Sequence, residues 1–348
     1  MWTAALQPHE HGRNGTMKAL VYTDTKVVEM REQPEPRASN DEVVVAIEAV
    51  GICGSDMHAY LGHDERRVPP LILGHEAAGT VIEGAHTGMR VVLNPLITCG
   101  ECDDCLSGRS NLCSARDLIG MYRPGAFAER IAIPARNLIE IPDGMDAALA
   151  ALTEPAATAL HAVNMAARVS QRPIAEARCV VFGGGSVGLF AALALANHGA
   201  AVVHLAETNP LRRATAAQTG ACEAIDPIAT PLEDSAYHIV IDAVGGRITR
   251  AESSRIVRAG GVIMHIGLQD NNDGLDVRRI TLQEVTFIGT YTYTQVDMRA
   301  TLAQLHRGGF GDLSWLEQRS LNAGASAFDD LLHGRSAAPK IVLRPDQA

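Results

Sequence analysis

The residues of this chain that are best suited to chemistry are cysteines, histidines and carboxylates in its first half. Four of the seven cysteines occur on one short stretch with C-x2-C-x2-C-x7-C spacing, namely Cys99, Cys102, Cys105 and Cys113. Four thiolates so close in sequence can surround one tetrahedral zinc ion and leave no open position for a substrate. The spacing therefore predicts a structural zinc site that orders a loop with little apolar content of its own. The rival interpretations are an iron–sulfur cluster and a metal-free group of thiols, and the tight, polar segment favours zinc over both.

A second set of potential ligands is spread over three separate segments. Cys53 lies within 51–58, His75 and Glu76 are adjacent, and Glu154 precedes a proline. Each residue alone is weak evidence, because a single cysteine or histidine is usually a core residue. Together, one thiolate, one imidazole and two carboxylates can hold zinc and leave a position for water or a substrate oxygen. The set therefore predicts a catalytic metal site.

A glycine-rich turn links an apolar run to an Ala/Leu-rich helical segment. Its sequence, Gly183-Gly184-Gly185-Ser186-Val187-Gly188, matches the G-x-G-x-x-G pattern in the context that the pattern requires. We expect Gly183 to allow the tight turn, Gly185 to let the backbone approach a pyrophosphate, and Gly188 to allow close helix packing. The backbone N–H groups at the helix start, around Ser186 and Val187, and the helix dipole favour phosphate groups. The turn predicts a dinucleotide site.

An acidic residue, Glu207, follows this turn at about the distance where a ribose-binding carboxylate belongs in such sites. A carboxylate accepts hydrogen bonds from the ribose hydroxyls and repels a 2′-phosphate, so the sequence favours NAD over NADP. Arg212 lies nearby and softens that preference, so the strictness of the choice stays open.

The expected pattern of secondary structure changes near Met145. Before it, short β-type runs alternate with Gly, Pro and Asn, which is typical of a compact β-barrel-like domain. After a helical segment at 146–165, strands and helices alternate, which predicts a parallel, doubly wound sheet. The expected strands are 43–50, 81–82, 90–93, 127–133, 179–182, 201–206, 238–242, 261–266 and 340–343, and the further helices are 187–198, 210–219, 249–258, 297–307 and 328–332.

Composition narrows the functional classes. The chain has 348 residues, enough for two domains, and a formal net charge of −10. Such an acidic surface repels nucleic-acid phosphates, so no nucleic-acid partner is expected. No apolar stretch is long enough to span a bilayer, and Met1 to Thr16 is a polar extension without a signal-peptide core. We therefore expect no membrane association and a reducing cytoplasmic location, where clustered thiols more often bind metal than form disulfides.

These motifs together resemble the zinc-containing medium-chain dehydrogenases, from about Met17 to near the C-terminus. The resemblance rests on Gly-Ile-Cys-Gly-Ser-Asp-x-His at 51–58, Gly-His-Glu at 74–76, the four-cysteine segment, Glu-Pro-x5-His at 154–161 and the glycine turn. It implies a GroES-like catalytic domain formed by residues 1–155 and 295–348, with a structural zinc lobe at 94–115. A Rossmann domain at 156–294 would bind NAD, and the active site would lie in the cleft.

The resemblance also implies individual roles. Cys53, His75 and Glu76 would be ligands of the catalytic zinc, and Asp56 would orient His75 through its other ring nitrogen. Ser55 matches the hydroxyl that takes the proton of the substrate, and His58 matches the outer end of the relay to solvent. Glu154 stands where ethanol-type members have a cysteine, as in the sorbitol, threonine and sugar-alcohol-phosphate branch. It would ligate zinc directly or hold the zinc-bound water, and the sequence does not decide between the two.

The implied activity is zinc-dependent, NAD-linked oxidation of a secondary alcohol, such as a polyol or sugar alcohol, to its ketone. A threonine or amino-alcohol dehydrogenase would have the same motifs. A non-catalytic NAD-binding protein is the third possibility, and the presence of Cys53, His75 and Glu76 argues against it. The resemblance further implies a homodimer or homotetramer, with the strand around Thr286 to Ile288 as a possible shared edge. The neighbouring Arg66 and Arg67 could meet a phosphate or an acidic substrate, but the sequence favours a solvated loop.

Overall fold

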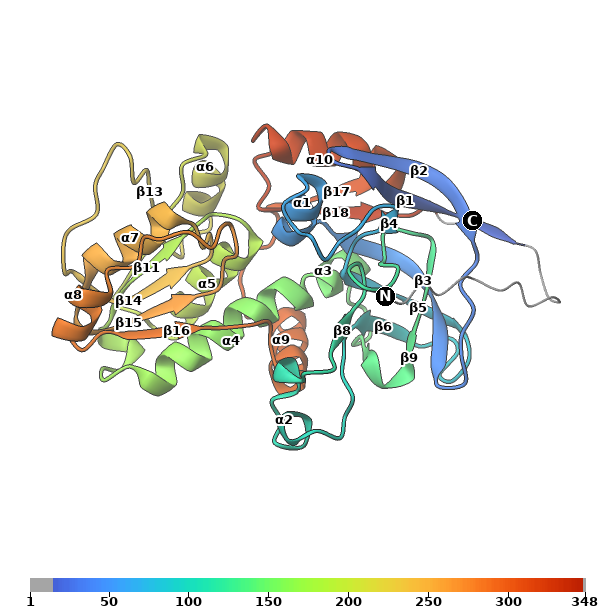
Figure 1. Cartoon of the computed structure of the whole chain (residues 1–348), viewed down its shortest axis with the longest axis horizontal. Coiled ribbons are helices and arrows are strands. Elements are labelled where there is room, and N and C mark those ends of the chain that lie inside the picture. Colours follow the sequence, from blue (N-terminus) through green and yellow to red (C-terminus); the bar gives the residue numbers. More distant parts are fainter. Residues whose placement is uncertain (1–14, 347–348) are drawn as a thin grey trace.

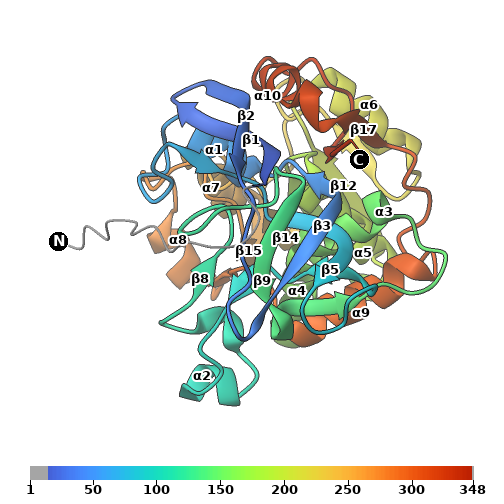
Figure 2. The ribbon, with the colours of Figure 1, turned by 90° about the vertical axis from the view of Figure 1, so that its right-hand side faces the viewer.

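The computed structural model describes residues 15–346. The expected N-terminal extension falls largely on residues 1–14, outside this range, and the first strand begins at Thr16. Figure 1 shows two halves side by side, one rich in strands and the other made of alternating strands and helices. Helix α4 (Thr153–Val169) runs between them, and a short lobe with α2 (Asp103–Leu106) projects from the strand-rich half (Figures 1 and 2).

A seven-stranded sheet forms the centre of the strand-rich half. Its longest strand, β3 (Glu42–Gly51), pairs with β5, β9 and β18, so the two ends of the chain share one sheet. The other elements of this half are β1 (Thr16–Asp24), β2 (Val27–Pro34), α1 (Gly54–Tyr60), β4 (Leu71–Ile72), β5 (Glu76–Glu83), β6 (Arg90–Leu93), β7 (Leu96–Ile97), β8 (Asp117–Leu118), β9 (Arg130–Pro134), β10 (Leu138–Glu140), β17 (Leu316–Ser320), α10 (Gly324–Leu332) and β18 (Lys340–Arg344).

The other half is a parallel six-stranded sheet with the strand order β13-β12-β11-β14-β15-β16. This order, two mononucleotide-binding units that meet between β11 and β14, defines a Rossmann fold. Its elements are β11 (Arg178–Phe182), α5 (Ser186–Asn197), β12 (Val202–Ala206), α6 (Pro210–Gln218), β13 (Glu223–Ile225), β14 (Tyr237–Asp242), α7 (Arg247–Ile256), β15 (Val257–His265), α8 (Val277–Leu282) and β16 (Thr286–Gly289). Two more helices, α3 (Ala147–Ala151) and α9 (Gln295–His306), lie beside α4.

The sequence predicts this alternation well but misplaces some boundaries. The helix expected over 146–165 is two helices, because the chain turns at Leu152 and α4 starts afresh at Thr153. Pro155 fits in the first turn of α4, where its missing N–H has no helical partner to lose. β15 begins at Val257, earlier than the expected start at 261, because Val257 pairs with Tyr237 before the register shifts. Among the elements that were not predicted are helices α1, α2 and α8 and strands β2, β13 and β17.

Short 3-10 helices complete the described structure, at Ser110–Leu112, Ala135–Asn137, Ile174–Glu176 and Leu321–Ala323. Among residues 15–346, no helix is both long enough and apolar enough to cross a membrane.

The C-terminal helix α10 is anchored in the strand-rich core through Phe328. Its ring lies 5.1 Å from that of Tyr60 and 5.9 Å from that of Phe127, centroid to centroid, and all three side chains are buried. Edge-to-face and tilted ring pairs add to the stabilisation that burial provides. The C-terminal segment is therefore an integral part of the half that begins with β1.

We predict that Phe328→Ala lowers the free energy of unfolding by about 3–5 kcal/mol, because a buried ring is lost and a cavity remains. Ile228→Ala, at a side chain that is 79% exposed, should change it by less than about 0.5 kcal/mol. Urea unfolding of both variants, followed by far-UV circular dichroism, measures the difference. Equal effects of the two substitutions would show that α10 is not integrated into this core.

Candidate active site

The first segment of the site is a short helix capped by its own aspartate. Cys53 precedes α1, and the carboxylate of Asp56 accepts a hydrogen bond of 2.9 Å from the backbone N–H of Cys53. The other oxygen of Asp56 accepts from the backbone N–H of Gly74 at 3.3 Å. One buried carboxylate thus ties the cysteine segment to the segment that contains His75.

Three of the four predicted ligands of the catalytic metal come together. The Sγ atom of Cys53, a ring nitrogen of His75 and a carboxylate oxygen of Glu76 all lie within 4.8 Å of one another. Gly51 makes this approach possible, because a Cβ atom there would lie 2.1 Å from Oε2 of Glu76. No role for Gly51 was predicted from the sequence. The close approach of Glu76 explains why a glycine stands at this position of the Gly-Ile-Cys motif.

The donors suit a cation electrostatically. Burial alone would lower the pKa of His75, but the charges of Asp56 and Cys53 outweigh it and raise that pKa well above its usual value. Nδ1 of His75 lies 3.4 Å from Oδ1 of Asp56, without an aligned hydrogen bond. Thr153 and Tyr293 also keep buried hydroxyl oxygens that have no hydrogen-bond partner. A thiol, an imidazole and a carboxylate in a largely buried, negatively charged pocket match the donor set of zinc.

Glu154 lies at the start of α4, near this group but not within it. Its oxygens are not within 4.8 Å of all three ligand atoms, so its predicted role in metal binding stays a prediction. Its pKa is raised to about 7, mainly by burial and also by the nearby charge of Glu76, while the charge of His75 opposes the shift. A carboxyl with this pKa is divided between its acid and its base form near neutral pH, which suits a group that exchanges protons with bound water.

The sequence analysis missed Lys340, the first residue of β18. Its ammonium group is fully buried and donates to both carboxylate oxygens of Glu76, at 2.7 and 2.5 Å, and to the backbone carbonyl of Ile52 at 2.7 Å. A lysine before an apolar run is ordinarily exposed, and its partner lies 264 residues away in the sequence. No local signal could have revealed the pair.

Ser55 and His58 share helix α1, and Ser55 faces the metal-ligand group. Its Oγ lies 3.4 Å from Nε2 of His75. His58 is half-buried, and burial and the neighbouring His63 lower its pKa. The imidazole is therefore mainly neutral at pH 7 and able to accept a proton. No direct hydrogen bond joins Ser55 and His58 among the described residues, so the predicted relay between them stays a prediction.

The interpretation of Arg66 and Arg67 as a solvated loop is correct for the first residue and wrong for the second. The side chain of Arg66 is 49% exposed, whereas that of Arg67 is 1% exposed. Arg67 is buried because its guanidinium group finds three partners, including the hydroxyl of Ser55. Sequence reasoning had no signal for this difference between two adjacent arginines.

The four-cysteine lobe has the geometry of a tetrahedral metal site. The four sulfur atoms lie within 4.8 Å of one another, and Cys99 is 3.5 Å from Cys113 and 3.9 Å from Cys105, sulfur to sulfur. A tetrahedron with Zn–S bonds of about 2.3 Å has edges of about 3.8 Å, so these separations fit zinc. Backbone N–H groups of Glu101 and Cys102 lower the pKa of Cys99 to about 6, which favours the thiolate that zinc requires.

The glycine turn lies at the carboxyl end of β11, and Glu207 follows β12 at the same edge of the sheet. Gly183 has a φ of +96°, and a Cβ atom on Gly188 would lie 1.9 Å from the carbonyl oxygen of Gly183. Gly185 caps α5 and has open space where a side chain would be, and Ser186 and Val187 begin the helix. This edge is where parallel sheets bind nucleotides.

Glu207 is buried and accepts hydrogen bonds from the backbone N–H groups of Gly184 and Asn209, at 2.8 and 2.7 Å. Arg212 donates to both of its oxygens, at 3.0 and 3.2 Å. Although burial opposes ionisation, Arg212 holds the pKa of Glu207 below its usual range. The carboxylate is thus charged and fixed in place, with the arginine as the partner that ribose hydroxyls would replace.

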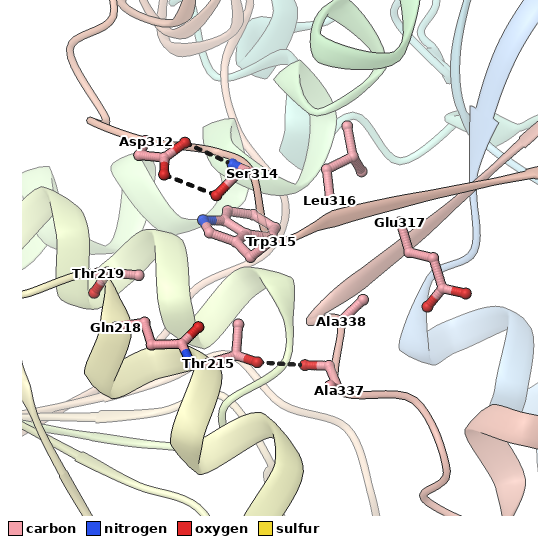
Figure 3. Close-up of a pocket in the computed structure, with 10 residues that line it drawn as sticks. All are labelled: Thr215, Gln218, Thr219, Asp312, Ser314, Trp315, Leu316, Glu317, Ala337 and Ala338. Carbon is pink, nitrogen blue, oxygen red and sulfur yellow. Dashed lines mark hydrogen bonds between the residues drawn. The ribbon is translucent and has the colours of Figure 1, made fainter.

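A cavity of about 580 Å³ lies elsewhere, between α6 and the loop that precedes β17 (Figure 3). Its lining includes Thr215 and Gln218 on one side and Asp312 and Trp315 on the other. None of the predicted site residues lines it. The cavity is therefore separate from the predicted metal and nucleotide sites, and those sites remain the candidate active site.

Two family models match the chain. The alcohol dehydrogenase GroES-like domain matches residues 39–143, and the zinc-binding dehydrogenase model matches residues 186–307. L-galactonate-5-dehydrogenase of Escherichia coli K12 is 31% identical, over 81% of this chain and 85% of the relative. The chain belongs to the zinc-binding alcohol dehydrogenase family. Sorbitol dehydrogenase of Bacillus subtilis 168 is 30% identical, over 95% and 98% of the two chains.

The architecture of this dehydrogenase also matches solved structures. Acetophenone reductase of Geotrichum candidum NBRC 4597, in complex with NAD, is 25% identical and superposes with a TM-score of 0.84, over 96% of this chain and 98% of that one. The strand-rich half is thus the GroES-like part of the dehydrogenase, and the parallel sheet is its Rossmann part.

We predict that Glu207→Gln shifts the cofactor preference of the dehydrogenase from NADH toward NADPH. The loss of charge-assisted hydrogen bonds to the ribose should weaken NADH binding about tenfold or more, and Arg212 is then free to meet a 2′-phosphate. Fluorescence titration with both reduced cofactors gives the ratio of dissociation constants. Glu176→Gln, at a side chain that is 62% exposed, is the matched control. An unchanged ratio in Glu207→Gln would exclude Glu207 from ribose recognition.

Proposed function

We propose that this dehydrogenase oxidises a secondary alcohol of a polyol or sugar alcohol to the ketone, with zinc and NAD. The observation that carries the proposal is the grouping of Cys53, His75 and Glu76 beside the hydroxyl of Ser55. The names of the relatives support the substrate class, since sorbitol is a polyol and L-galactonate is a sugar acid with several hydroxyl groups.

In this proposal Cys53, His75 and Glu76 hold the catalytic zinc, and Cys99, Cys102, Cys105 and Cys113 hold a structural zinc. Bound zinc supplies a Lewis acid that lowers the pKa of an alcohol oxygen, and bound NAD supplies the hydride acceptor. Asp56 lies 3.4 Å from the ring of His75 and favours its positive form, and Lys340 fixes the orientation of Glu76. The protein thereby holds the reacting oxygen beside Ser55 without using a side chain for hydride transfer.

Ser55 accepts the hydroxyl proton of the substrate, and His58 receives it on the way to solvent. The lowered pKa of His58 supports this role, because a neutral imidazole can accept a proton near pH 7. Glu154, with a pKa of about 7, is proposed to act on the water or alcohol at the zinc, either by direct ligation or through that water.

For cofactor binding we assign the pyrophosphate to the turn from Gly183 to Gly188 and the ribose to Glu207. The catalytic domain would comprise residues 1–155 and 295–348, and the Rossmann domain residues 156–294. The sheet that β3 and β18 share supports this division, because it joins the two ends of the chain. We also propose a reducing cytoplasmic location, with which seven cysteines without a disulfide among residues 15–346 are compatible.

We further propose that the dehydrogenase assembles as a homodimer or homotetramer through the outer edge of β16. This strand pairs only with β15 in the described chain, so its other edge is open. The preceding helix α8 presents Val277 and Leu282, which are 62% and 72% exposed. An unpaired strand edge and exposed apolar side chains on the preceding helix are features that a second copy would cover.

Leu282→Glu should therefore shift the protein toward monomer in size-exclusion chromatography with light scattering. Burial of a charge in an interface without a partner opposes association. Val296→Glu, at an equally exposed position on α9, should leave the mass unchanged. A native monomer, or an unaltered mass for Leu282→Glu, would contradict the proposed interface.

The central experiment follows NADH absorbance across a panel of sugar alcohols, their phosphates, sugar acids, threonine, butanediol and simple alcohols. We expect turnover of a polyol-type substrate, loss of at least about 100-fold in kcat/KM for Cys53→Ser, and one zinc per chain in place of two. Cys222→Ser, at a thiol outside both cysteine groups, should keep wild-type turnover and zinc content. Turnover of threonine alone would favour the amino-alcohol alternative, and NAD binding without a second zinc or turnover would favour a non-catalytic protein.

A further inference from the structure

A buried arginine points at the hydroxyl that takes the substrate proton in the proposed function. Nη2 of Arg67 lies 3.4 Å from Oγ of Ser55. The other two nitrogens of the guanidinium group also have partners, since Nε donates to the carbonyl of Gly120 at 2.9 Å and Nη1 to Asp64 at 2.6 Å. Arg67 thus joins helix α1, the loop that follows it and the loop after β8.

The charge of Arg67 lies close to two acidic groups. Asp64 is its ion-pair partner, and the same carboxylate also pairs with Arg66, at 2.8 Å. The charges of His75 and Arg67 help to lower the pKa of buried Asp56 against the effect of burial. Arg67 is 3% exposed, so solvent screens its charge little beside Ser55.

The hydrogen bond from Arg67 to Ser55 also limits the direction in which the Ser55 hydroxyl can donate its own hydrogen. A hydroxyl has one hydrogen and two lone pairs, and Arg67 has no lone pair to accept a bond. When Nη2 donates to Oγ, one lone pair is occupied and the Ser55 hydrogen must point to another acceptor. The remaining lone pair is then available for a proton donor, such as the hydroxyl of an alcohol.

We propose that Arg67 is a positioning residue that holds Ser55 in the donor and acceptor arrangement required for proton removal from the alcohol. The inference rests on the proposed function. In the step, the proton of the alcohol moves to Oγ of Ser55 while the original Ser55 hydrogen leaves to the next acceptor outward. Arg67 keeps all its hydrogens, and its charge stabilises the oxygen during the exchange. No oxidant or further reactant is needed for this proton transfer.

A purely structural role for Arg67 makes a different prediction. Its bonds to Gly120 and Asp64 tie two loops together, and the loss of those bonds would affect stability whatever residue stands at position 55. A role through Ser55 requires that the effect of changing Arg67 disappears when the Ser55 hydroxyl is absent. The combination of the two substitutions therefore separates the two explanations.

The test compares Arg67→Lys, Ser55→Ala and the double variant, with Arg66→Gln as the matched control. Lysine keeps the charge and the pairing with Asp64 but cannot reach three partners at once. We expect Arg67→Lys to lower kcat about tenfold or more with little change in KM. It should add less than about twofold in the Ser55→Ala background, and Arg66→Gln should stay near wild type.

A second readout does not depend on turnover. Proton release on binding of NAD and trifluoroethanol, an alcohol that is acidic and hard to oxidise, is followed with an indicator dye in weakly buffered solution. Wild type should release the proton faster than Arg67→Lys, with equal zinc content and equal NADH affinity in both proteins. Thermal unfolding with zinc and NADH present establishes that the compared variants are folded.

Equal losses from Arg67→Lys in the wild-type and Ser55→Ala backgrounds would overturn the inference and leave a structural role. A loss in Arg66→Gln as large as that in Arg67→Lys would overturn it as well. If wild type oxidises no alcohol, the proposed function fails on its own evidence. The proton-release rates then decide the inference, and equal rates in wild type and Arg67→Lys overturn it.

Discussion

The buried ion pair between Lys340 and Glu76 is the interaction on which the arrangement of the site depends. Both side chains are essentially inaccessible to solvent, and the ammonium group also binds the carbonyl of Ile52, directly before Cys53. One group therefore joins β18, the cysteine segment and the strand that starts at Glu76. Removal of one partner would leave an uncompensated buried charge, which typically costs about 3–5 kcal/mol. The C-terminal strand is thereby required for the site as well as for the sheet.

The charge in this pocket explains why the same residues suit a cation. Cys53, Glu76, Asp56 and Glu154 contribute or can contribute negative charge within a small buried volume, and Lys340 neutralises only part of it. The charges of Asp56 and Cys53 raise the pKa of His75 against the effect of burial. A pocket that raises the pKa of a buried imidazole favours positive charge. A divalent metal ion carries more positive charge than an imidazolium and is favoured more strongly there. The cost of gathering these acids is thus offset by the ion that they bind.

Local sequence signals predicted the parts of the molecule that depend on local geometry. The spacing of four cysteines and the glycine turn each fix a structure within about fifteen residues, so both were recognisable from the sequence. The partners of Lys340 and the Gly120 carbonyl that binds Arg67 lie far away in the chain, and neither the lysine nor the arginine carries a local mark of burial. Arg66 and Arg67 both pair with Asp64, but only Arg67 also donates to Gly120 and Ser55 and is buried. The alternation of strands and helices was predictable, whereas the break between α3 and α4 at Leu152 was not.

Helix α4 connects this site to the nucleotide half, and its packing explains how the two are held in register. Glu154 occupies its first turn, while its length packs against α5, the helix that begins at the glycine turn. At its middle, Nδ1 of His161 lies 2.8 Å from the carboxylate of Asp297 in α9. Burial would raise the pKa of Asp297, but its hydrogen bonds with His161 and Thr294 lower it to about 2, so the carboxylate stays charged over the working pH range. Because that depressed pKa favours the folded state, its contribution is present at neutral pH and is lost only as the pH falls toward about 2. One helix thus connects the helix of the glycine turn with the carboxylate that lies near the metal-ligand group.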